Sequence, residues 1–182
     1  MITHTHPDHI GSLGSLIHYS FYVLHKPVNI ILPVGAKYLS SIEGILKGFG
    51  CRKEMYNYIS EVEFDNNYKV FQKIRYVETT HCNELNCYSL IFYTSKGIVY
   101  YSGDTDETTT LKKIIDSGNK IDKLYIDTTS VDIFNNAHLY IGVLKKVIPN
   151  ELKNKVYCMH LNSDDCIKQA ETLGYNVVEI GK

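Results

Sequence analysis

Four side chains of metal-binding types crowd the first nine residues of the chain. The string THTHPDH contains His4, His6, Asp8 and His9 in the pattern H-x-H-x-D-H. Two histidines two residues apart on an extended segment point to the same side, so His4 and His6 can converge on one ion. Imidazole nitrogen together with carboxylate oxygen suits Zn²⁺, Mn²⁺ or Fe²⁺. The pattern therefore predicts a transition-metal site, and a fortuitous polar turn or an expression-tag remnant is the alternative without chemistry.

Further ligands must come from elsewhere, because four ligands on one short segment cannot enclose two ions. His81 follows the apolar stretch YVETT, Asp104 follows YYSG, and His160 ends KVYCMH. Active sites in layered α/β sheets collect at strand ends. We therefore expect His81, Asp104 and His160 to join the amino-terminal cluster. Ser102 and Thr105 flank Asp104 and are expected to orient it.

The elements that must position these residues alternate between helix and strand. Helical spacing of apolar residues predicts helices over residues 10–25, 35–50, 107–118, 138–148 and 163–174. Strand patterns cover residues 59–102 in general, and the individual strands are predicted over 28–32, 68–77, 87–94, 97–103, 123–127, 155–160 and 176–180. This order is typical of an α/β layered fold, and the length predicts a single domain over residues 1–182.

The composition limits the classes of partner that the chain is expected to bind. Hydrophobic residues make up 44% and charged residues 21%, and the net charge of −1 gives no polybasic signal for membranes or long nucleic acids. The sequence shows no signal peptide and no apolar run of membrane-spanning length, which predicts a soluble, cytoplasmic protein. The five cysteines are odd in number and lack C-x-x-C spacing, which favours reduced thiols, with Cys82 and Cys158 open as additional metal ligands.

The ordered set THTHPDH, TTH at His81, SGDT at Asp104 and CMHL at His160 resembles the ligand set of the metallo-β-lactamase-fold hydrolases over residues 2–162. This resemblance implies an αββα sandwich that holds two divalent metal ions, and we expect Zn²⁺, with Mn²⁺ as the alternative. It implies one ion on His4, His6 and His81, a second ion on Asp8, His9 and His160, and Asp104 as the bridge. Such a dinuclear site supplies a hydroxide at neutral pH, and Asp8 is implied to be its catalytic base.

Two further residues favour one branch of that superfamily. KLYIDTTS puts Asp127 at a strand end, and NNAHLYIG puts His138 at the start of a helix. The order resembles ribonuclease Z and its relatives, and it implies that His138 is a substrate-binding and catalytic residue that donates a proton or a hydrogen bond to the scissile phosphate or to the leaving oxygen. Asp127 would orient His138 and hold its charge. A structural or surface histidine at 138 and a solvated carboxylate at 127 are the alternatives.

The substrate is expected to be small. No Gly- and Lys-rich insertion resembles the arm with which ribonuclease Z grips transfer RNA, and RNA affinity rests heavily on phosphate neutralisation. In layout the sequence is similar to the phage enzymes that destroy cyclic mononucleotide signals in anti-Pycsar defence. We therefore expect a metal-dependent hydrolase, a phosphodiesterase acting on a small cyclic nucleotide. A thioesterase or lactonase of the same fold is the second hypothesis, and a truncated relative without activity is the third.

The part of the sequence that precedes the H-x-H-x-D-H turn is short. Members of the family begin with several strands before the H-x-H-x-D-H turn, whereas only Met1, Ile2 and Thr3 precede His4. We therefore expect an N-terminally truncated fold with an uncovered sheet edge and apolar face. Such surfaces favour pairing with another molecule, so the sequence predicts a homodimer.

Overall fold

The computed structural model describes residues 1–35, 39–67, 71–134 and 136–179 of the chain. These residues form two compact units, Met1–Val70 and Phe71–Lys182. Each unit has its own sheet, and the units are joined within a segment that lies outside the described residues. The single domain over residues 1–182 stays a prediction.

The first unit is built around two parallel strands, β1 (Val28–Leu32) and β2 (Tyr56–Ser60). Parallel strands need a crossover between them, and helix α3 (Leu39–Gly48) provides it. The unit also contains α1 (Pro7–Ile10), α2 (Leu13–Tyr22), α4 (Glu61–Asn67) and the 3-10 turn η1 (Lys53–Met55). Its core is formed by almost fully buried apolar side chains, among them Ile17, Ile30, Ile42, Leu46 and Met55.

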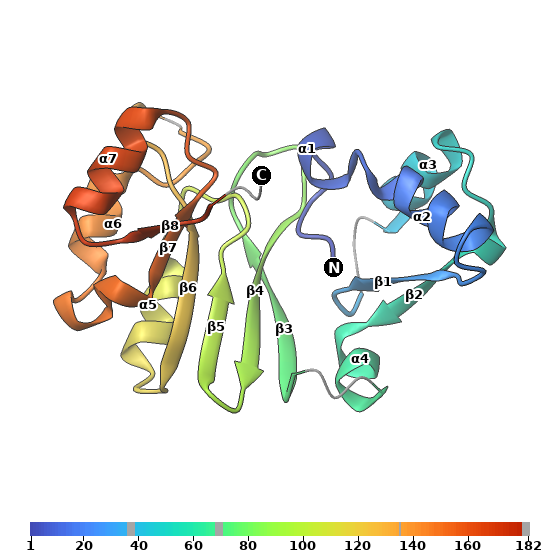
Figure 1. The fold of residues 1–182 in the computed structure, drawn as a ribbon, viewed down its shortest axis with the longest axis horizontal. Helices are drawn as coiled ribbons and strands as arrows, with labels where there is room; N and C mark the ends of the chain where they lie inside the picture. The colour runs from blue at the N-terminus through green and yellow to red at the C-terminus, as the bar shows by residue number, and fades with distance from the viewer. Residues whose placement is uncertain (36–38, 68–70, 135, 180–182) are drawn as a thin grey trace. The chain divides into compact units, whose positions relative to one another are not determined.

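The second unit contains a six-stranded sheet in the order β3-β4-β5-β6-β7-β8. The strands are β3 (Lys73–Thr79), β4 (Cys87–Thr94), β5 (Gly97–Tyr101), β6 (Ile121–Asp127), β7 (Val156–Met159) and β8 (Asn176–Val177). β4 runs antiparallel to both of its neighbours, and every pair from β5 to β8 is parallel. Consequently β3, β5, β6 and β7 point in the same direction, and their carboxyl ends lie at one edge of the sheet (Figure 1).

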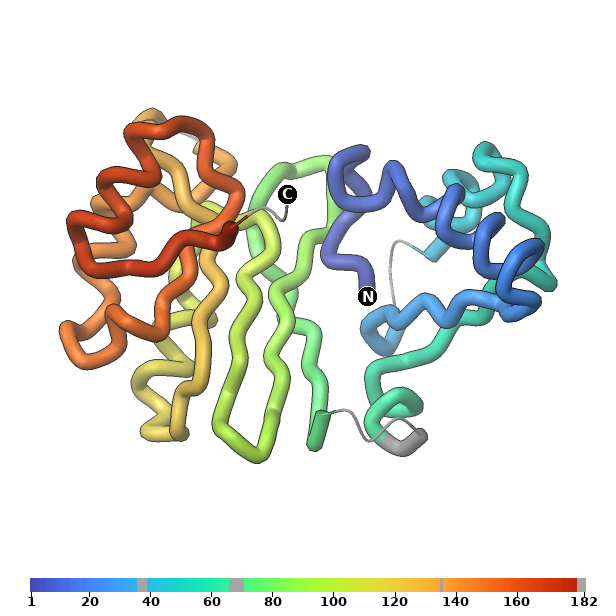
Figure 2. Tube along the Cα trace, in the orientation of Figure 1, coloured from blue at the N-terminus to red at the C-terminus, as the bar shows by residue number. Residues whose placement is uncertain are grey.

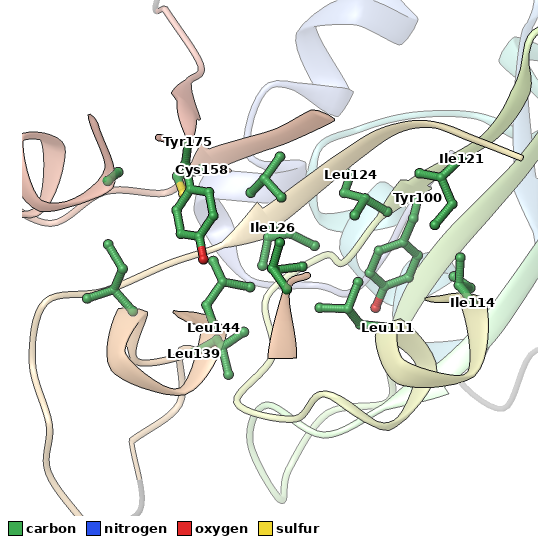
Figure 3. Close-up of a cluster of buried hydrophobic side chains, with 14 of the residues drawn as sticks. Tyr100, Leu111, Ile114, Ile121, Leu124, Ile126, Leu139, Leu144, Cys158 and Tyr175 are labelled. Atoms are coloured by element: carbon green, nitrogen blue, oxygen red, sulfur yellow. The ribbon is translucent and has the colours of Figure 1, made fainter. Parts of the chain in front are cut away.

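Helices of the second unit cover its hydrophobic core. They are α5 (Thr109–Asp116), α6 (Ile141–Val147) and α7 (Asp164–Thr172), with the 3-10 turn η2 (Asn150–Lys155). Leu124 and Ile126 are two residues apart on β6, so their side chains lie on the same face of the sheet. There they pack in a cluster with Tyr100, Leu111 and Leu144 (Figure 3). All five are 2% exposed or less, so the strands that lead to the edge are fixed from the helical side.

The secondary structure confirms much of the sequence prediction. The strands over 28–32 and 87–94 match β1 and β4, and α5, α6 and α7 lie inside their predicted ranges. Residues 36–38, 68–70 and 180, which belong to a predicted helix and two predicted strands, lie outside the described residues.

The strand pattern over residues 59–102 is wrong at its beginning, where α4 forms. Ser60 accepts a hydrogen bond at its Oγ from the backbone N–H of Glu63 across 3.1 Å. This Ser-x-x-Glu spacing is the signature of a helix start, and it outweighs the alternation of the neighbouring residues.

The amino-terminal segment also differs from expectation. Residues 1–6 pair with no strand in the described part of the chain, so the segment that carries His4 and His6 belongs to no sheet there. His6 is extended, and Pro7 occupies the first turn of α1, where its missing N–H costs nothing.

Among the described residues, no helix has the length and the apolar character needed to cross a membrane.

Candidate metal centre

Four of the expected site residues stand at the carboxyl ends of strands in the second unit. His81 follows β3, Asp104 follows β5, Asp127 ends β6 and His160 follows β7. These ends share one edge of the sheet, and the β4–β5 turn lies at the opposite edge (Figure 2). The parallel direction of the strands therefore gathers residues that are far apart in the sequence.

Asp104 faces two imidazole rings. It is 4% exposed, and its Oδ2 lies 3.9 Å from Nε2 of His81 and 3.6 Å from Nε2 of His160. Both separations are too long for hydrogen bonds. Two ligands on one zinc ion lie roughly 3 to 3.5 Å apart, given bonds of about 2.0–2.2 Å. Oδ2 of Asp104 therefore lies slightly farther from the two imidazole nitrogens than ligands of one ion do, and the bridging role of Asp104 stays a prediction.

His81 is oriented by a backbone group. Its Nδ1 donates to the carbonyl oxygen of Ala137 across 2.8 Å. This leaves Nε2, the atom that faces Asp104, as the nitrogen with a lone pair. Metal-binding histidines commonly donate their other ring N–H in this way. Thr79 and Thr105 share a hydroxyl hydrogen bond of 2.7 Å, which ties the end of β3 to the segment after β5.

His160 adopts a backbone conformation that side chains other than glycine rarely take. Its φ is +58°, in the left-handed region. Its ring stacks on His138, with centroids 4.6 Å apart and an interplanar angle of 21°. Such strain persists where the surrounding structure holds a side chain in a required position.

Asp127 is the most deeply buried carboxylate of the site, with an exposure of 0%. Its Oδ2 accepts hydrogen bonds from the backbone N–H of Thr105 across 2.9 Å and from Nδ1 of His138 across 2.8 Å. Burial raises the pKa of Asp127, and the hydrogen bond from His138 opposes that rise. Its Oδ1 is buried without a hydrogen-bond partner in the described residues and lies 3.8 Å from Nδ1 of His160. A buried carboxylate oxygen in this position fits a nearby cation.

Ser102 and Thr105 do not have the role expected of them. Ser102 accepts at its Oγ from the backbone N–H of Asp127 across 2.8 Å, and Thr105 donates its own N–H to the Asp127 carboxylate. Ser102 and Thr105 therefore orient Asp127 through these contacts, and the prediction that they orient Asp104 is wrong. The reason is that β5 and β6 are parallel neighbours, so the segment after β5 lies beside the end of β6.

The two cysteines left open as ligands lie differently in the second unit. Cys158 is a fully buried member of the hydrophobic cluster, drawn beside Tyr175 in Figure 3. Cys82 is partly exposed in the segment that follows His81. Cys158 therefore packs in the core. Of the two cysteines, Cys82 is the one that stays a candidate ligand, because it lies next to His81.

A hollow opens beside the paired histidines. It has a volume of about 240 Å³ and is lined by Thr129, His138, His160, Leu161 and Asn162. Because Nδ1 of His138 is engaged by Asp127, Nε2 is its remaining ring nitrogen. The donor atoms of Asp127, His138 and His160 lie within 4.8 Å of one another, as do those of His81, Asp104 and His138. The edge therefore combines metal-competent groups with an adjoining space for a ligand.

The amino-terminal motif forms its own cluster in the first unit. Nε2 of His4 lies 3.1 Å from Nδ1 of His6, and the rings of His4 and His9 have centroids 4.1 Å apart. Nε2 of His9 lies 3.5 Å from Oδ2 of Asp8. The structure thus brings these four residues together. Joint metal binding by this set and the strand-end residues stays a prediction.

The solved structures that are similar to this one include YhfI and Igni18. YhfI, a metallo-β-lactamase fold protein from Bacillus subtilis, is 17% identical with a TM-score of 0.69, and the match covers 99% of this chain and 74% of that one. Igni18, a metallo hydrolase from the hyperthermophilic archaeon Ignicoccus hospitalis KIN4/I, is also 17% identical, with a TM-score of 0.59 and a coverage of 98% and 74%. No curated protein matches the chain.

At these identities the two structures show the fold, which is that of the metallo-β-lactamases, as the sequence predicts. A family model described as "Anti-Pycsar protein Apyc1" matches residues 1–181. The match spans the amino-terminal motif, the strand-end residues and the His138–Asp127 pair. The chain therefore belongs to the anti-Pycsar Apyc1 family of metallo-β-lactamase-fold proteins.

Proposed function

We propose that this protein is a metal-dependent phosphodiesterase that hydrolyses a small cyclic nucleotide. The observation that carries the proposal is the hydrogen-bonded pair of His138 and Asp127 at the same sheet edge as Asp104 and His160. A metal site with an adjoining imidazole suits the cleavage of a phosphodiester, which needs charge stabilisation and a proton for the leaving oxygen. Membership of the anti-Pycsar family supports a cyclic nucleotide as the substrate.

The metal ligands are proposed as two sets with one shared member. His4, His6 and His81 would hold one ion, Asp8, His9 and His160 would hold the other, and Asp104 would be the shared member. Imidazole and carboxylate donors suit Zn²⁺, with Mn²⁺ as the alternative. When bound, the ions supply positive charge for the phosphate and lower the pKa of water. The orientation of His81 by the backbone carbonyl of Ala137 supports this assignment.

Three side chains, His138, Asp127 and Asp8, have separate roles in proton transfer. His138 binds the phosphate and delivers a proton from Nε2 to the leaving oxygen, because Nδ1 is held by Asp127. Asp127 keeps the ring in one orientation and stabilises its charged form. Asp8 acts as the base toward the attacking water.

A substrate screen paired with metal analysis tests the proposal. The zinc-loaded protein is incubated with cyclic mononucleotides, a thioester and a lactone, and the products are separated by chromatography. We expect conversion of cyclic to linear mononucleotides, and loss of that activity when a chelator removes the metal. Turnover of the thioester or lactone alone would instead support the second hypothesis. Absence of all turnover in metal-loaded protein would make the chain a non-catalytic relative.

We also propose that the chain functions as a homodimer in the cytoplasm. Leu16 and Tyr19 on α2 and Val23, which directly follows it, continue one helical spacing, and each is more than half exposed. Residues 13–22 contain no Asp, Glu, Lys or Arg, so two copies of this face can meet across a two-fold axis without burying a formal charge of these types. The five cysteines are free, which is typical of a reducing compartment.

A further inference from the structure

The segment between β6 and α6 presents apolar side chains to solvent. Phe134 is 93% exposed, Ile133 61% and Val131 39%. Exposed apolar side chains that are neighbours on one segment make that segment a candidate binding surface. Phe134 is the most exposed large hydrophobic residue among those described, and it contributes nothing to the core.

The ends of this segment are fastened at the candidate site. The backbone N–H of Thr129 donates to the carbonyl of Leu139 across 2.9 Å, and the N–H of Ile141 donates to the carbonyl of Thr129 across 2.9 Å. Within the segment, Nδ2 of Asn136 donates to the carbonyl of Val131 across 2.7 Å. The described residues of the segment are therefore tied together at its base by these hydrogen bonds. Thr129 and His138, which stand at its two ends, both line the hollow beside His160.

We propose that Phe134 is the platform on which the nucleobase of the substrate stacks while the phosphate lies beside His138. This inference rests on the proposed function and extends it to the base. A cyclic nucleotide needs polar groups for its phosphate and an apolar plane for its base, and the loop joins both within a few residues. Stacking tolerates every base, because each has a π-face, so Phe134 binds purines and pyrimidines alike.

A nucleobase fits this patch better than a protein partner does. Stable interfaces between proteins bury about 800 Å² on each partner, which takes roughly 20 to 30 residues. The patch consists of Val131, Ile133 and Phe134, and Asp132 and Asn136 stand among and beside them. A second copy of the chain is the competing occupant, and the experiment distinguishes it.

Fluorescence provides the direct test, because the chain contains no tryptophan. Phe134→Trp is then the sole tryptophan, and the zinc-loaded variant is titrated with a hydrolysis-resistant phosphorothioate of cyclic adenosine monophosphate. We expect quenching by this nucleotide and none by 1-O-methylribose cyclic phosphate, which lacks a base. The matched control is Lys96→Trp, an exposed position in the β4–β5 turn at the opposite edge of the sheet, where neither compound should change the emission (Figure 2).

Kinetics provide the second readout. Removal of one stacking partner should raise the KM for cyclic mononucleotides by roughly 5- to 100-fold in Phe134→Ala, with kcat nearly unchanged. Phe134→Tyr should restore the KM, and cleavage of the abasic compound should be equal in all three proteins. An unchanged KM in Phe134→Ala, together with no quenching in Phe134→Trp, would overturn the stacking role while leaving the proposed function intact.

Two other outcomes separate the hypotheses. If emission of Phe134→Trp changes with protein concentration alone and ignores nucleotide, the loop docks a second copy and the stacking role is wrong. If the wild-type protein cleaves no cyclic nucleotide but the base-bearing compound still quenches Phe134→Trp, the proposed function fails and the stacking site stands.

Discussion

His138 donates its Nδ1–H to Oδ2 of Asp127 across 2.8 Å, and the accepting carboxylate is completely buried. The same oxygen accepts from the backbone N–H of Thr105, and the backbone of Asp127 is held by Ser102. Asp127 is thus held by the segment that follows β5 before any ligand arrives. A ring held by such a group is already oriented, so little rearrangement is needed during the reaction.

Replacement of the paired residues should slow chemistry without removing metal. His138→Ala is expected to lower kcat on cyclic mononucleotides by about 10²- to 10⁴-fold, the range of a lost general acid. Asp127→Asn keeps the size of the side chain but loses its charge, so a reduction in the same direction is expected. Rates and bound metal are measured on the same preparations. An unchanged rate in His138→Ala would return His138 to a structural role, and lost metal would make it a ligand.

His81→Ala should remove one metal ion and abolish hydrolysis. The expected loss follows from the position of its Nε2, which lies 3.9 Å from Oδ2 of Asp104. Metal content is measured by elemental analysis after gel filtration, and activity on cyclic mononucleotides is measured in parallel. His25→Ala is the matched control, because His25 is exposed and follows α2 in the first unit. Full metal content and turnover in His81→Ala would contradict the ligand assignment.

Charge on the exposed face of α2 should dissociate the proposed dimer. Leu16→Glu and Tyr19→Glu each place a charge at the centre of an apolar contact, which should weaken association by about tenfold or more. Sedimentation velocity over a range of concentrations gives the dissociation constants. Val62→Glu on α4 serves as the control, since Val62 is exposed but lies on another helix. A wild-type protein that stays monomeric at every concentration would disprove the dimer.

Stability should fall at alkaline pH because of buried thiols. Burial raises the pKa of Cys158 from 9.0 to about 11 and that of Cys87 to about 12. The unfolded chain therefore loses these protons first. Their contribution is complete below pH 9 and declines as the pH rises toward 11, by up to about 1.4 kcal/mol per pH unit for each thiol.

Urea unfolding at pH 7.5, 9 and 10.5 checks this dependence. The midpoint should fall most steeply between the last two values, and Cys158→Ala should fall less steeply than the wild type. A midpoint that is constant over this range would show that the thiols make no such contribution.

The sequence alone determined the types of the functional side chains and their places at strand ends. His81, Asp104, Asp127 and His160 each follow a short apolar or alternating run, and such local patterns predict strands well. The ordered ligand motifs also predicted the fold that the solved structures share. The prediction was wrong where a helix-capping contact competed with an alternating strand pattern, as in the hydrogen bond from Glu63 to Ser60 at the start of α4.

Only the tertiary structure decided which groups orient the site. The carbonyl of Ala137 accepts a hydrogen bond from His81, a residue 56 positions earlier. Every residue has a backbone carbonyl, so the amino-acid sequence does not show which one will accept. Thr105 and Ser102 bind Asp127 because β5 and β6 are parallel neighbours, a relation that exists only once the sheet has formed. The exposure of Phe134 is equally a tertiary property, since the core forms without it. Side-chain chemistry is local, whereas the partners of each side chain depend on contacts between distant segments.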